Sequence, residues 1–411
     1  MKKIENNLEL AVQECAELAK WIQQNQGLLI DILLPIESQE TVNDEIFKSI
    51  DALNNIAKEG ISDFMPVGNG ATFFPINLPF YSLVIFGIIP GIFAEKMFIR
   101  PPELMRGYMK RIFSVLPKMR LTQGLELCNC DRTEFMEDYV DKSKFVLFTG
   151  TLKNANIIRK KIRKDQVFIF NGQGINPVVI SADANIALAV DKTCEVKRFN
   201  SGQDCAAADS IFVHADVYEA FKEKLIADLD QLHVGAYKEG ATIGPLADPS
   251  HTLIAAEHLF KWRHSIGYGG QIDIHNAIVK PTIVECAAAE DANLKELFSP
   301  IWHLCKYETE EDLRKYFDQP PYREYAMYVS LFGTSDYLAQ QQHTIVLKDL
   351  IIMDVERGNK EYGGYSIGAS FVQFNGKTEA RPILISREIK RAFFSVYQDN
   401  VDVILEVAAN A

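Results

Sequence analysis

The sequence has no excess of positive charge and no long run of basic residues. Its 411 residues include 43 Lys and Arg against 55 Asp and Glu, which gives a formal net charge of −12. Proteins that bind nucleic acid through the phosphates need a basic surface to neutralise them. We therefore expect no nucleic-acid partner, although a small polyanionic ligand can still bind where positive charge is concentrated locally.

Long apolar runs and an even set of cysteines are also absent. The most hydrophobic stretch, residues 78–98, is interrupted by Pro90 and by a Glu-Lys pair, so we interpret it as a buried helix and expect no membrane partner. The first 26 residues carry Glu and Gln along an amphipathic pattern and are expected to belong to the folded protein. Seven scattered cysteines indicate free thiols in a reducing, cytoplasmic location.

Short apolar runs alternate with helical patterns, which is typical of an α/β fold with a parallel sheet. The tail, residues 401–411, has one apolar face and is expected to be a strand at an oligomer contact or at a sheet edge. An Asn-Gly pair in residues 66–76 indicates a hairpin or tight turn. The predicted strands are residues 96–101, 144–150, 167–172, 177–181 and 210–214, and the predicted helices are 102–116, 152–164 and 217–232.

Cys205 is the cysteine with the surroundings of a nucleophile. It follows Asn-Ser-Gly-Gln-Asp and precedes three alanines, so Gly202 allows an unusual backbone turn and the alanines leave room for a substrate. A catalytic cysteine needs an accessible thiolate and donors for the oxyanion that forms on attack at a carbonyl. The pair at Cys128 and Cys130 resembles half of a metal site but has no second pair at a suitable spacing, so we predict no metal.

The sequence from about residue 66 onward resembles the aldehyde dehydrogenase superfamily. Asn200 to Cys205 is similar to that family's Asn-x-Gly-Gln-x-Cys motif, which ends in the nucleophile. Further similar motifs follow in the family's order: Pro75-Ile76-Asn77-Leu78-Pro79, Arg100-Pro101-Pro102-Glu103, Phe148-Thr149-Gly150-Thr151, Pro281-Thr282, Glu296-Leu297-Phe298-Ser299-Pro300 and Tyr362-Gly363-Gly364-Tyr365. The portion before Asn77 is shorter than is usual in the family, so part of the cofactor domain or an oligomerisation arm is expected to be missing.

The resemblance implies the fold class and a domain plan. It implies a Rossmann-like cofactor domain plus an α/β catalytic domain, with a short C-terminal oligomerisation strand. We expect a dinucleotide-binding domain at residues 1–172, and part of residues 370–395 is a candidate to complete it. The catalytic cysteine domain is expected at 173–370 and the strand at 396–411. A homodimer or homotetramer is the expected assembly.

The same resemblance implies the roles of the site residues. Cys205 attacks an aldehyde, and Asn77 has an amide that can donate to the oxyanion together with the backbone N–H of Cys205. The sequence lacks a GxGxxG fingerprint, as the family does. The family instead implies Arg100 and Glu103 at the adenosine ribose, Thr149 and Gly150 near the pyrophosphate, and Glu296 and Phe298 at the nicotinamide end. Glu103 favours NAD, whereas Arg100 in place of the usual lysine keeps NADP as an alternative.

One departure from the family changes the expected mechanism. The water-activating glutamate of the hydrolytic members corresponds to Asn171, and a carboxamide cannot accept a proton near neutral pH. We expect an NAD(P)-dependent oxidoreductase acting on a small aldehyde, with a thioacyl intermediate. Alternatives are a CoA-acylating enzyme, an acyl-phosphate reductase of the glutamyl phosphate type, or an enzyme in which Asp204 or Glu296 is the base. A catalytically impaired binding protein of the same fold is the alternative from another class.

Overall fold

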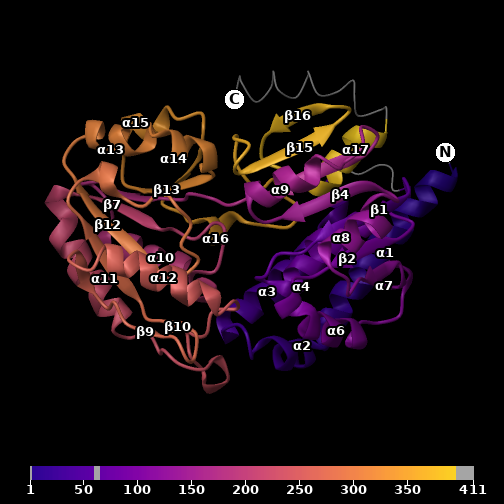
Figure 1. Cartoon of the computed structure of the whole chain (residues 1–411), viewed down its shortest axis with the longest axis horizontal. Helices are drawn as coiled ribbons and strands as arrows, with labels where there is room; N and C mark the ends of the chain where they lie inside the picture. The colour runs from indigo at the N-terminus through magenta and orange to yellow at the C-terminus, as the bar shows by residue number, and fades with distance from the viewer. Residues whose placement is uncertain (1, 60–64, 395–411) are drawn as a thin grey trace.

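The computed structural model describes residues 2–59 and 65–394, and describes side chains from residue 9 onward. The described chain forms two lobes, each built around a seven-stranded sheet (Figure 1). None of the described helices is long and apolar enough to cross a membrane. The predicted α/β class with parallel sheets is confirmed.

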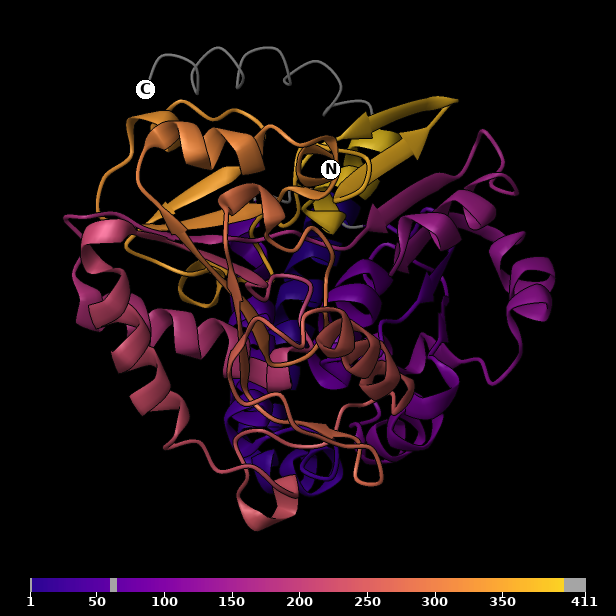
Figure 2. The ribbon, with the colours of Figure 1, turned by 60° about the vertical axis from the view of Figure 1, so that its left-hand side comes forward.

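The first sheet has the strand order β16-β15-β5-β4-β1-β2-β3. Strands β1 to β5 pair in parallel, whereas β15 and β16 add to β5 in antiparallel fashion. In Figure 2 the yellow β15–β16 pair extends the purple strands of this lobe. The strands are β1 (Asn69–Phe73), β2 (Met97–Arg100), β3 (Leu125–Leu127), β4 (Ser143–Thr149), β5 (Val167–Asn171), β15 (Ser370–Phe374) and β16 (Lys377–Ala380).

The second sheet has the order β14-β13-β6-β7-β12-β11-β8, parallel except for β8. Its five inner strands are buried along most of their length, whereas the edge strands β8 and β14 are partly exposed. The strands are β6 (Val178–Ile180), β7 (Ser210–His214), β8 (Ile266–Tyr268), β11 (Thr282–Cys286), β12 (Ile301–Tyr307), β13 (Tyr328–Phe332) and β14 (Ile345–Lys348). A separate hairpin joins β9 (Ile272–Asp273) and β10 (Ile278–Val279).

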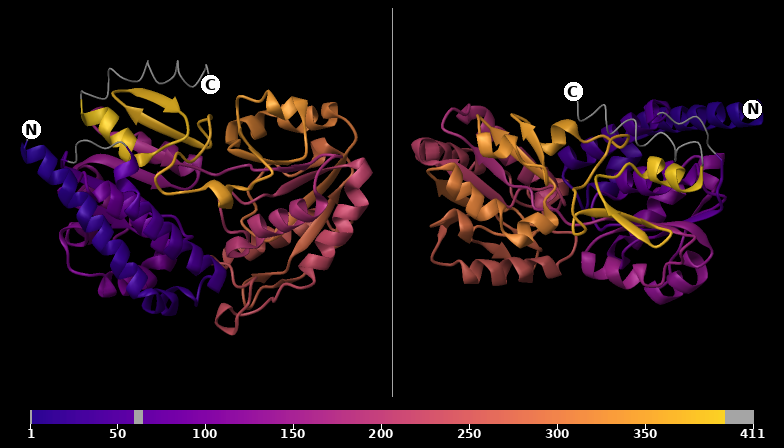
Figure 3. Two further views of the ribbon diagram at one scale, coloured as in Figure 1. Left: turned by 180° about the vertical axis from the view of Figure 1, so that it is seen from behind. Right: turned by 90° about the horizontal axis from the view of Figure 1, so that it is seen from above.

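Helices cover both sheets. The N-terminal helices run along the back of the first lobe (Figure 3), where their apolar faces form one core with β2, β4 and β5. In the first lobe the main helices are α1 (Lys2–Gln24), α2 (Gln26–Leu33), α3 (Gln39–Asn54), α6 (Arg106–Val115), α9 (Leu152–Arg159) and α17 (Ile385–Phe393). In the second lobe they are α10 (Ile186–Arg198), α11 (Tyr218–Leu229), α12 (Ser250–Lys261), α13 (Glu310–Phe317) and α14 (Pro320–Tyr325), with α16 (Ile352–Val355) leading back toward the first lobe.

Three local predictions need correction. The hairpin at 66–76 is wrong, because this segment contains the central strand β1, parallel to both neighbours. A Cβ at Gly70 would collide with the side chains of Phe145 and Met97, so this glycine allows close packing and does not mark a turn. The helix at 78–98 ends at Gly91, and the helix at 152–164 ends at Arg159. The C-terminal strand at 396–411 lies outside the described residues.

The apolar segment after Asn77 forms three consecutive helical pieces. They are α4 (Pro79–Leu83), a π-helical turn η2 (Val84–Ile88) and α5 (Ile89–Gly91). Pro79 occupies the first turn of α4, where the missing N–H has no helical partner to lose. This segment forms one wall of the cleft described next.

Candidate active site

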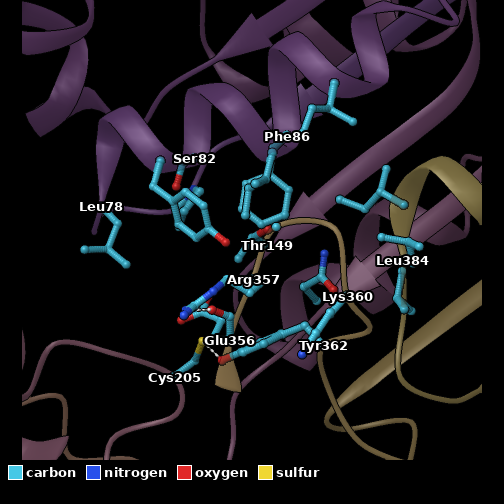
Figure 4. A pocket seen from close by; sticks show the side chains of 18 of the residues that line it. Leu78, Ser82, Phe86, Thr149, Cys205, Glu356, Arg357, Lys360, Tyr362 and Leu384 are labelled. Carbon is cyan, nitrogen blue, oxygen red and sulfur yellow. Dashed lines mark hydrogen bonds between the residues drawn. The ribbon is translucent and has the colours of Figure 1, made fainter. Parts of the chain in front are cut away.

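A cleft lined by residues of both lobes contains the predicted nucleophile (Figure 4). Its empty space measures about 830 Å³, the open mouth included. The wall formed by α4, η2 and the start of α17 is mainly apolar. The opposite side carries polar and charged groups. The residues used below are Asn77, Thr149, Asn171, Asp204, Cys205, Glu356, Arg357, Lys360 and Tyr362.

Cys205 follows a loop with an unusual backbone. Asn200 and Ser201 have φ values of 46° and 54°, and Gly202 has a φ of 76°. A Cβ at Gly202 would lie 2.6 Å from the carbonyl oxygen of Ser299, so only glycine fits here. The loop therefore packs directly on the segment that carries Glu296 and Phe298.

The side chains of the cysteine motif hold this loop in place. Ser201 Oγ lies 2.7 Å from Tyr237 Oη and accepts a hydrogen bond of 2.9 Å from the backbone N–H of Gly244. Gln203 Oε1 accepts from the N–H of Ala247 at 2.7 Å, and Gln203 Nε2 donates back to Asn200 O at 3.0 Å. Asn200, Ser201 and Gln203 are all buried, so their role in this structure is to fix the backbone before Cys205.

The backbone carbonyl group of Cys205 is hydrogen-bonded, whereas its backbone N–H group has no acceptor among the described residues. Its carbonyl oxygen accepts a 2.8 Å hydrogen bond from Asn176 Nδ2. Gly174 packs against the same carbonyl so closely that a Cβ would collide with it. No acceptor for the backbone N–H of Cys205 is found among the described residues. This N–H is therefore available to an oxyanion formed next to the sulfur.

Asn77 reaches the same cleft from the corner that begins α4. Its Nδ2 donates to the carbonyl oxygen of Gln203 at 3.1 Å. A carboxamide has two N–H hydrogens, so the second one remains available for a substrate oxygen. The next residue, Leu78, has a φ of 49°, and this left-handed turn directs the chain into α4.

A buried pair of carboxyl groups holds this corner. Glu37 Oε1 accepts from the N–H of Leu78 at 3.0 Å, and Glu45 Oε2 accepts from the N–H groups of Phe80 and Tyr81 at 3.0 and 2.9 Å. The two carboxyl groups also hydrogen-bond each other, and burial raises the pKa of both. The pKa of Glu45 rises more than that of Glu37, because the charge of Glu37 adds to the effect of burial.

Asn171 and Thr149 lie in the cleft at the carboxyl ends of the adjacent strands β5 and β4. Asn171 is buried, with 6% of its surface exposed, and its side chain has no hydrogen bond to another described residue. The amide of Asn171 is therefore free to contact a ligand in the cleft.

Asp204 is the carboxylate next to the nucleophile. Its Oδ1 accepts from the N–H of Ala206 at 2.7 Å, whereas Oδ2 has no partner among the described residues. Burial, and secondly the charge of Glu356, raise its pKa to about 7. Asp204 is therefore placed in the cleft with a carboxyl group that can exchange a proton near neutral pH.

Three acidic side chains lie near the thiol of Cys205. Burial first, and then the charges of Asp204, Glu296 and Glu356, raise its pKa well above the usual value. A hydrogen bond with Tyr362 acts in the opposite direction. Cys205 is nevertheless partly exposed, whereas the other six cysteines are buried.

The predicted cofactor residues do not line this cleft, apart from Thr149. Arg100 ends β2, where its Nε donates to the carbonyl oxygen of Cys130 at 3.2 Å. Glu103 begins the next turn, η3 (Glu103–Met105), and is exposed without an ion-pair partner among the described residues. Gly150 follows β4, and Thr151 then caps α9 by accepting from the N–H of Asn154.

Glu296 and Phe298 lie on the segment that packs on the cysteine loop. Glu296 Oε2 accepts a hydrogen bond of 2.9 Å from Gln173 Nε2, and burial raises its pKa to about 8. Phe298 has a φ of 51°, and its ring centroid lies 5.6 Å from that of His251. Glu296 thus lies close enough to Cys205 to influence the thiol, although it does not line the cleft.

Sequence reasoning missed three residues of this site. Tyr362 stands in a matched motif but received no role, although its hydroxyl lies 2.9 Å from Cys205 Sγ. Asn176 and Glu356 were not singled out at all. The only sequence signal for them was their closeness to matched motifs, because their contacts join residues far apart in the chain.

Comparisons with known proteins agree with the fold and the motifs. The family model described as "Aldehyde dehydrogenase family" matches residues 3–335. Lactaldehyde dehydrogenase of Methanococcus vannielii is 27% identical over 60% of this chain and 55% of its own length. Sulfoacetaldehyde dehydrogenase of Neptuniibacter caesariensis is 27% identical over 62% of this chain and 57% of its own length. The matched regions thus span little more than half of these relatives.

Solved structures of low sequence identity share the fold. Glyceraldehyde-3-phosphate dehydrogenase GapN of Methanocaldococcus jannaschii, solved with NADP, has a TM-score of 0.73 at 18% identity, covering 92% of this chain and 95% of that one. Betaine aldehyde dehydrogenase of Staphylococcus aureus has a TM-score of 0.75 at 17% identity, covering 92% of this chain and 83% of that one. On its sequence, motifs and fold, the chain belongs to the aldehyde dehydrogenase family.

Proposed function

We propose that this protein is an NAD(P)-dependent oxidoreductase that oxidises an aldehyde through a covalent intermediate on Cys205. The observation that carries the proposal is the meeting of Asn77, Asn171 and Cys205 in one cleft, with a free N–H at the cysteine. The relatives named above are dehydrogenases of small aldehydes, which supports the same substrate class. The open mouth of the cleft gives such a substrate access to the sulfur.

The residues of the cleft support the first step. The Cys205 thiolate attacks the aldehyde carbon, a C–S bond forms, and the carbonyl π electrons become an oxyanion. The N–H of Cys205 and the free amide hydrogen of Asn77 then stabilise that oxyanion. Such donors act strongly in a buried site, because they are oriented before the charge develops. After oxidation a thioacyl group remains on Cys205.

The residues at the strand ends fit a dinucleotide. Arg100 ends β2 and Glu103 follows it, whereas Thr149 ends β4 and Gly150 follows it. Because β1 lies between these two parallel strands, both pairs lie at the carboxyl edge of one sheet. This edge is where α/β sheets hold nucleotides. The Glu103 carboxylate has no ion-pair partner among the described residues, so it can accept hydrogen bonds from the hydroxyl groups of a ribose. When bound, NAD(P) supplies the hydride acceptor.

We favour NAD over NADP. The Glu103 carboxylate accepts hydrogen bonds from a free 2′-hydroxyl and repels a 2′-phosphate. Arg100, the candidate partner for a 2′-phosphate, donates to the carbonyl oxygen of Cys130 instead. Among proteins of this fold, GapN was solved with NADP and a betaine aldehyde dehydrogenase variant with NAD+. Titration with each dinucleotide tests the preference directly.

Release of the acyl group is the step at which this chain departs from hydrolytic relatives. Asn171 can hold a water molecule or the substrate, but it cannot take a proton. A thiol such as CoA is therefore a second candidate acceptor, and reduction of an activated acyl group is the same chemistry in reverse. Asp204 is the cleft carboxylate that could assist water instead.

The domain plan and assembly remain part of the proposal. Residues 1–172 with part of 370–395 would form the cofactor domain and 173–370 the catalytic domain, which agrees with the strands of each sheet. A cytoplasmic homodimer or homotetramer is the assembly we propose. Light scattering of the full chain measures the oligomeric state.

Absorbance at 340 nm with a panel of aldehydes tests the function. We expect NAD(P)H formation by the wild type and none by Cys205→Ala. NAD(P)H formation by the Cys205→Ala variant would overturn the proposed nucleophile. Product analysis with and without CoA separates a thioester from a free acid. Calorimetry that detects neither NAD nor NADP would favour a binding protein that has kept only the fold.

A further inference from the structure

The hydroxyl group of Tyr362 is the one hydrogen-bond partner of the Cys205 sulfur among the described residues. Tyr362 Oη lies 2.9 Å from Cys205 Sγ, and Figure 4 shows the two side chains meeting at the floor of the cleft. In the neutral pair either atom can be the donor. A thiolate has no hydrogen, so in the ionised pair only the tyrosine hydroxyl can donate.

The cleft also carries the cationic side chains of Arg357 and Lys360, but the other large influences on the pKa of the Cys205 thiol oppose ionisation. Burial and the charges of Asp204, Glu296 and Glu356 all raise the pKa of the thiol, and the Tyr362 hydroxyl lowers it. A cysteine attacks a carbonyl as the thiolate. The site therefore needs a group that favours the ionised sulfur, and the phenol is the contact that does so.

Tyr362 is held so that its hydroxyl stays directed at the sulfur. Its backbone N–H donates to Ile383 O at 3.0 Å, and the N–H of Ile383 donates back to Tyr362 O at 2.8 Å. Its ring centroid lies 5.8 Å from that of Tyr328, whose hydroxyl accepts from the N–H of Gly363 at 3.1 Å. A phenylalanine would make the same backbone and ring contacts. The hydroxyl adds the contact with Cys205 and no other among the described residues.

We propose that Tyr362 is a catalytic residue that donates a hydrogen bond to the Cys205 thiolate and so favours its formation at neutral pH. The thiol proton leaves to the solvent that fills the cleft, and the phenol keeps its own proton. Because a hydrogen bond to a charged group is stronger than one to a neutral group, the contact stabilises the thiolate more than the thiol. The inference rests on the proposed function, since it concerns the same nucleophile.

Alkylation of Cys205 tests the inference without any turnover. The full-length wild type and Tyr362→Phe would react with iodoacetamide between pH 6 and 10, with mass spectrometry following the peptide that contains Cys205. Cys205→Ala gives the background from the six buried cysteines. We expect Tyr362→Phe to react about 10-fold more slowly at pH 7.5, which corresponds to a rise of about one unit in the pKa of the thiol.

Tyr365→Phe is the matched control, because it removes a hydroxyl from an exposed ring in the same segment. Its alkylation profile should match that of the wild type. A Tyr362→Phe profile identical to the wild type would overturn the inference, and so would an equal loss of rate in Tyr365→Phe, which would indicate a general change in this segment. Aldehyde oxidation by the same variants is measured separately. If no variant and no wild type oxidises aldehydes but the alkylation shift is present, the proposed function fails and the tyrosine–thiol pair stands.

Discussion

Lys48 Nζ lies 2.8 Å from Glu356 Oε2, and this buried ion pair joins α3 to the segment that leads to Tyr362. The same nitrogen lies 2.9 Å from Asp44 Oδ2, and only 1% of the lysine side chain is exposed. The two carboxylates raise the pKa of Lys48 although burial acts to lower it. A helix of the N-terminal region is thus connected electrostatically to the floor of the cleft.

Replacing Lys48 with methionine should therefore destabilise the protein and disturb the cleft. Two carboxylates would be left near Asp204 without their cation, and removing one partner of a buried ion pair costs about 3 kcal/mol. Lys48 also lowers the pKa of Asp204, so that pKa should rise further. Urea unfolding measures the stability. Lys20→Met, at an exposed position of α1, is the control and should change little. Equal stability of the two variants would contradict the role of the pair.

Loss of the Asn77 amide should slow catalysis more than it weakens binding. Asn77→Ala removes one of two donors to the oxyanion, and such a loss typically lowers kcat by about 10²-fold to 10³-fold. The KM should change little, because the oxyanion exists only after attack. Steady-state kinetics provide both values. Asn54→Ala, at the exposed end of α3, should leave both unchanged. A large rise in KM with normal kcat would show that Asn77 binds substrate instead.

A glutamate at position 171 should restore water activation. Asn171 already lies in the cleft at the end of β5, so Asn171→Glu places a carboxylate in the cleft that contains Cys205. A positioned general base typically increases the rate of a step by about 10²-fold or more. The rate of free-acid formation should therefore increase by about that factor. Asn171→Gln has the same length without a base and is the matched control. Quantifying the acid without CoA decides the outcome, and an unchanged rate in Asn171→Glu would show that another step limits release.

Asp204→Asn tests the alternative base in the unmodified chain. If Asp204 assists water, the variant should form acid more slowly while the initial burst of NAD(P)H remains, because only the second half-reaction needs a base. Since its carboxyl titrates near pH 7, acid formation in the wild type should rise with pH through that range. A pH-independent rate of acid formation, or no change in Asp204→Asn, would remove Asp204 from the mechanism.

The cysteine loop should not tolerate a side chain at Gly202. An alanine there combines a φ of 76° with a Cβ placed 2.6 Å from the carbonyl oxygen of Ser299, and the strain should cost about 2–3 kcal/mol. Gly240 is a matched control, because its φ is 81° and nothing lies within 4 Å of a Cβ. The difference in unfolding free energy between Gly202→Ala and Gly240→Ala therefore measures the collision alone. No difference would mean that the loop relaxes away from Ser299.

The sequence predicted the buried strands well, and the reason is physical. Strands β4, β5 and β7 are buried along almost their whole length, so they read as unbroken apolar runs and their bounds agree with the prediction to within one residue. β1 was missed because its Asn-Gly pair is also a turn signal. Only the packing of Phe145 and Met97 around Gly70 shows why a glycine stands in the centre of a sheet.

The site residues that belong to short sequence motifs could be predicted from the sequence. Asn77, Asn171 and Cys205 belong to local patterns, and the structure brings the three together. The contacts that set the charge of the site do not follow from local patterns. Lys48 and Glu356 are 308 residues apart in the chain, and Tyr362 and Cys205 are 157 apart. No propensity or periodicity within a segment carries that information.

The buried carboxyl groups should make the protein less stable as pH rises. Burial raises the pKa of Glu37 and Glu45, and raises those of Glu59, Asp204 and Glu296 to about 7, 7 and 8. Burial lowers the pKa of His258 to about 4 and that of His303 to about 3, which opposes this effect below about pH 6.5. Above that pH the folded state binds more protons than the unfolded state, and stability must fall as pH increases to about 8. Thermal unfolding at pH 7.0 and pH 8.5 should show a higher Tm at the lower pH.

Glu45→Gln should weaken this dependence without removing the hydrogen bonds of the corner. The amide oxygen can still accept from the N–H groups of Phe80 and Tyr81, and the amide N–H can donate to the neighbouring Glu37 carboxyl group. Because the amide cannot ionise, the difference in Tm between the two pH values should be smaller than in the wild type. Glu45→Ala leaves two buried N–H groups unpaired and should cost about 2 kcal/mol at both pH values. Glu239→Gln, at an exposed position, should keep the wild-type slope. A Glu45→Gln slope equal to that of the wild type would mean that Glu45 stays protonated throughout, and that the other raised carboxyl groups carry the whole dependence.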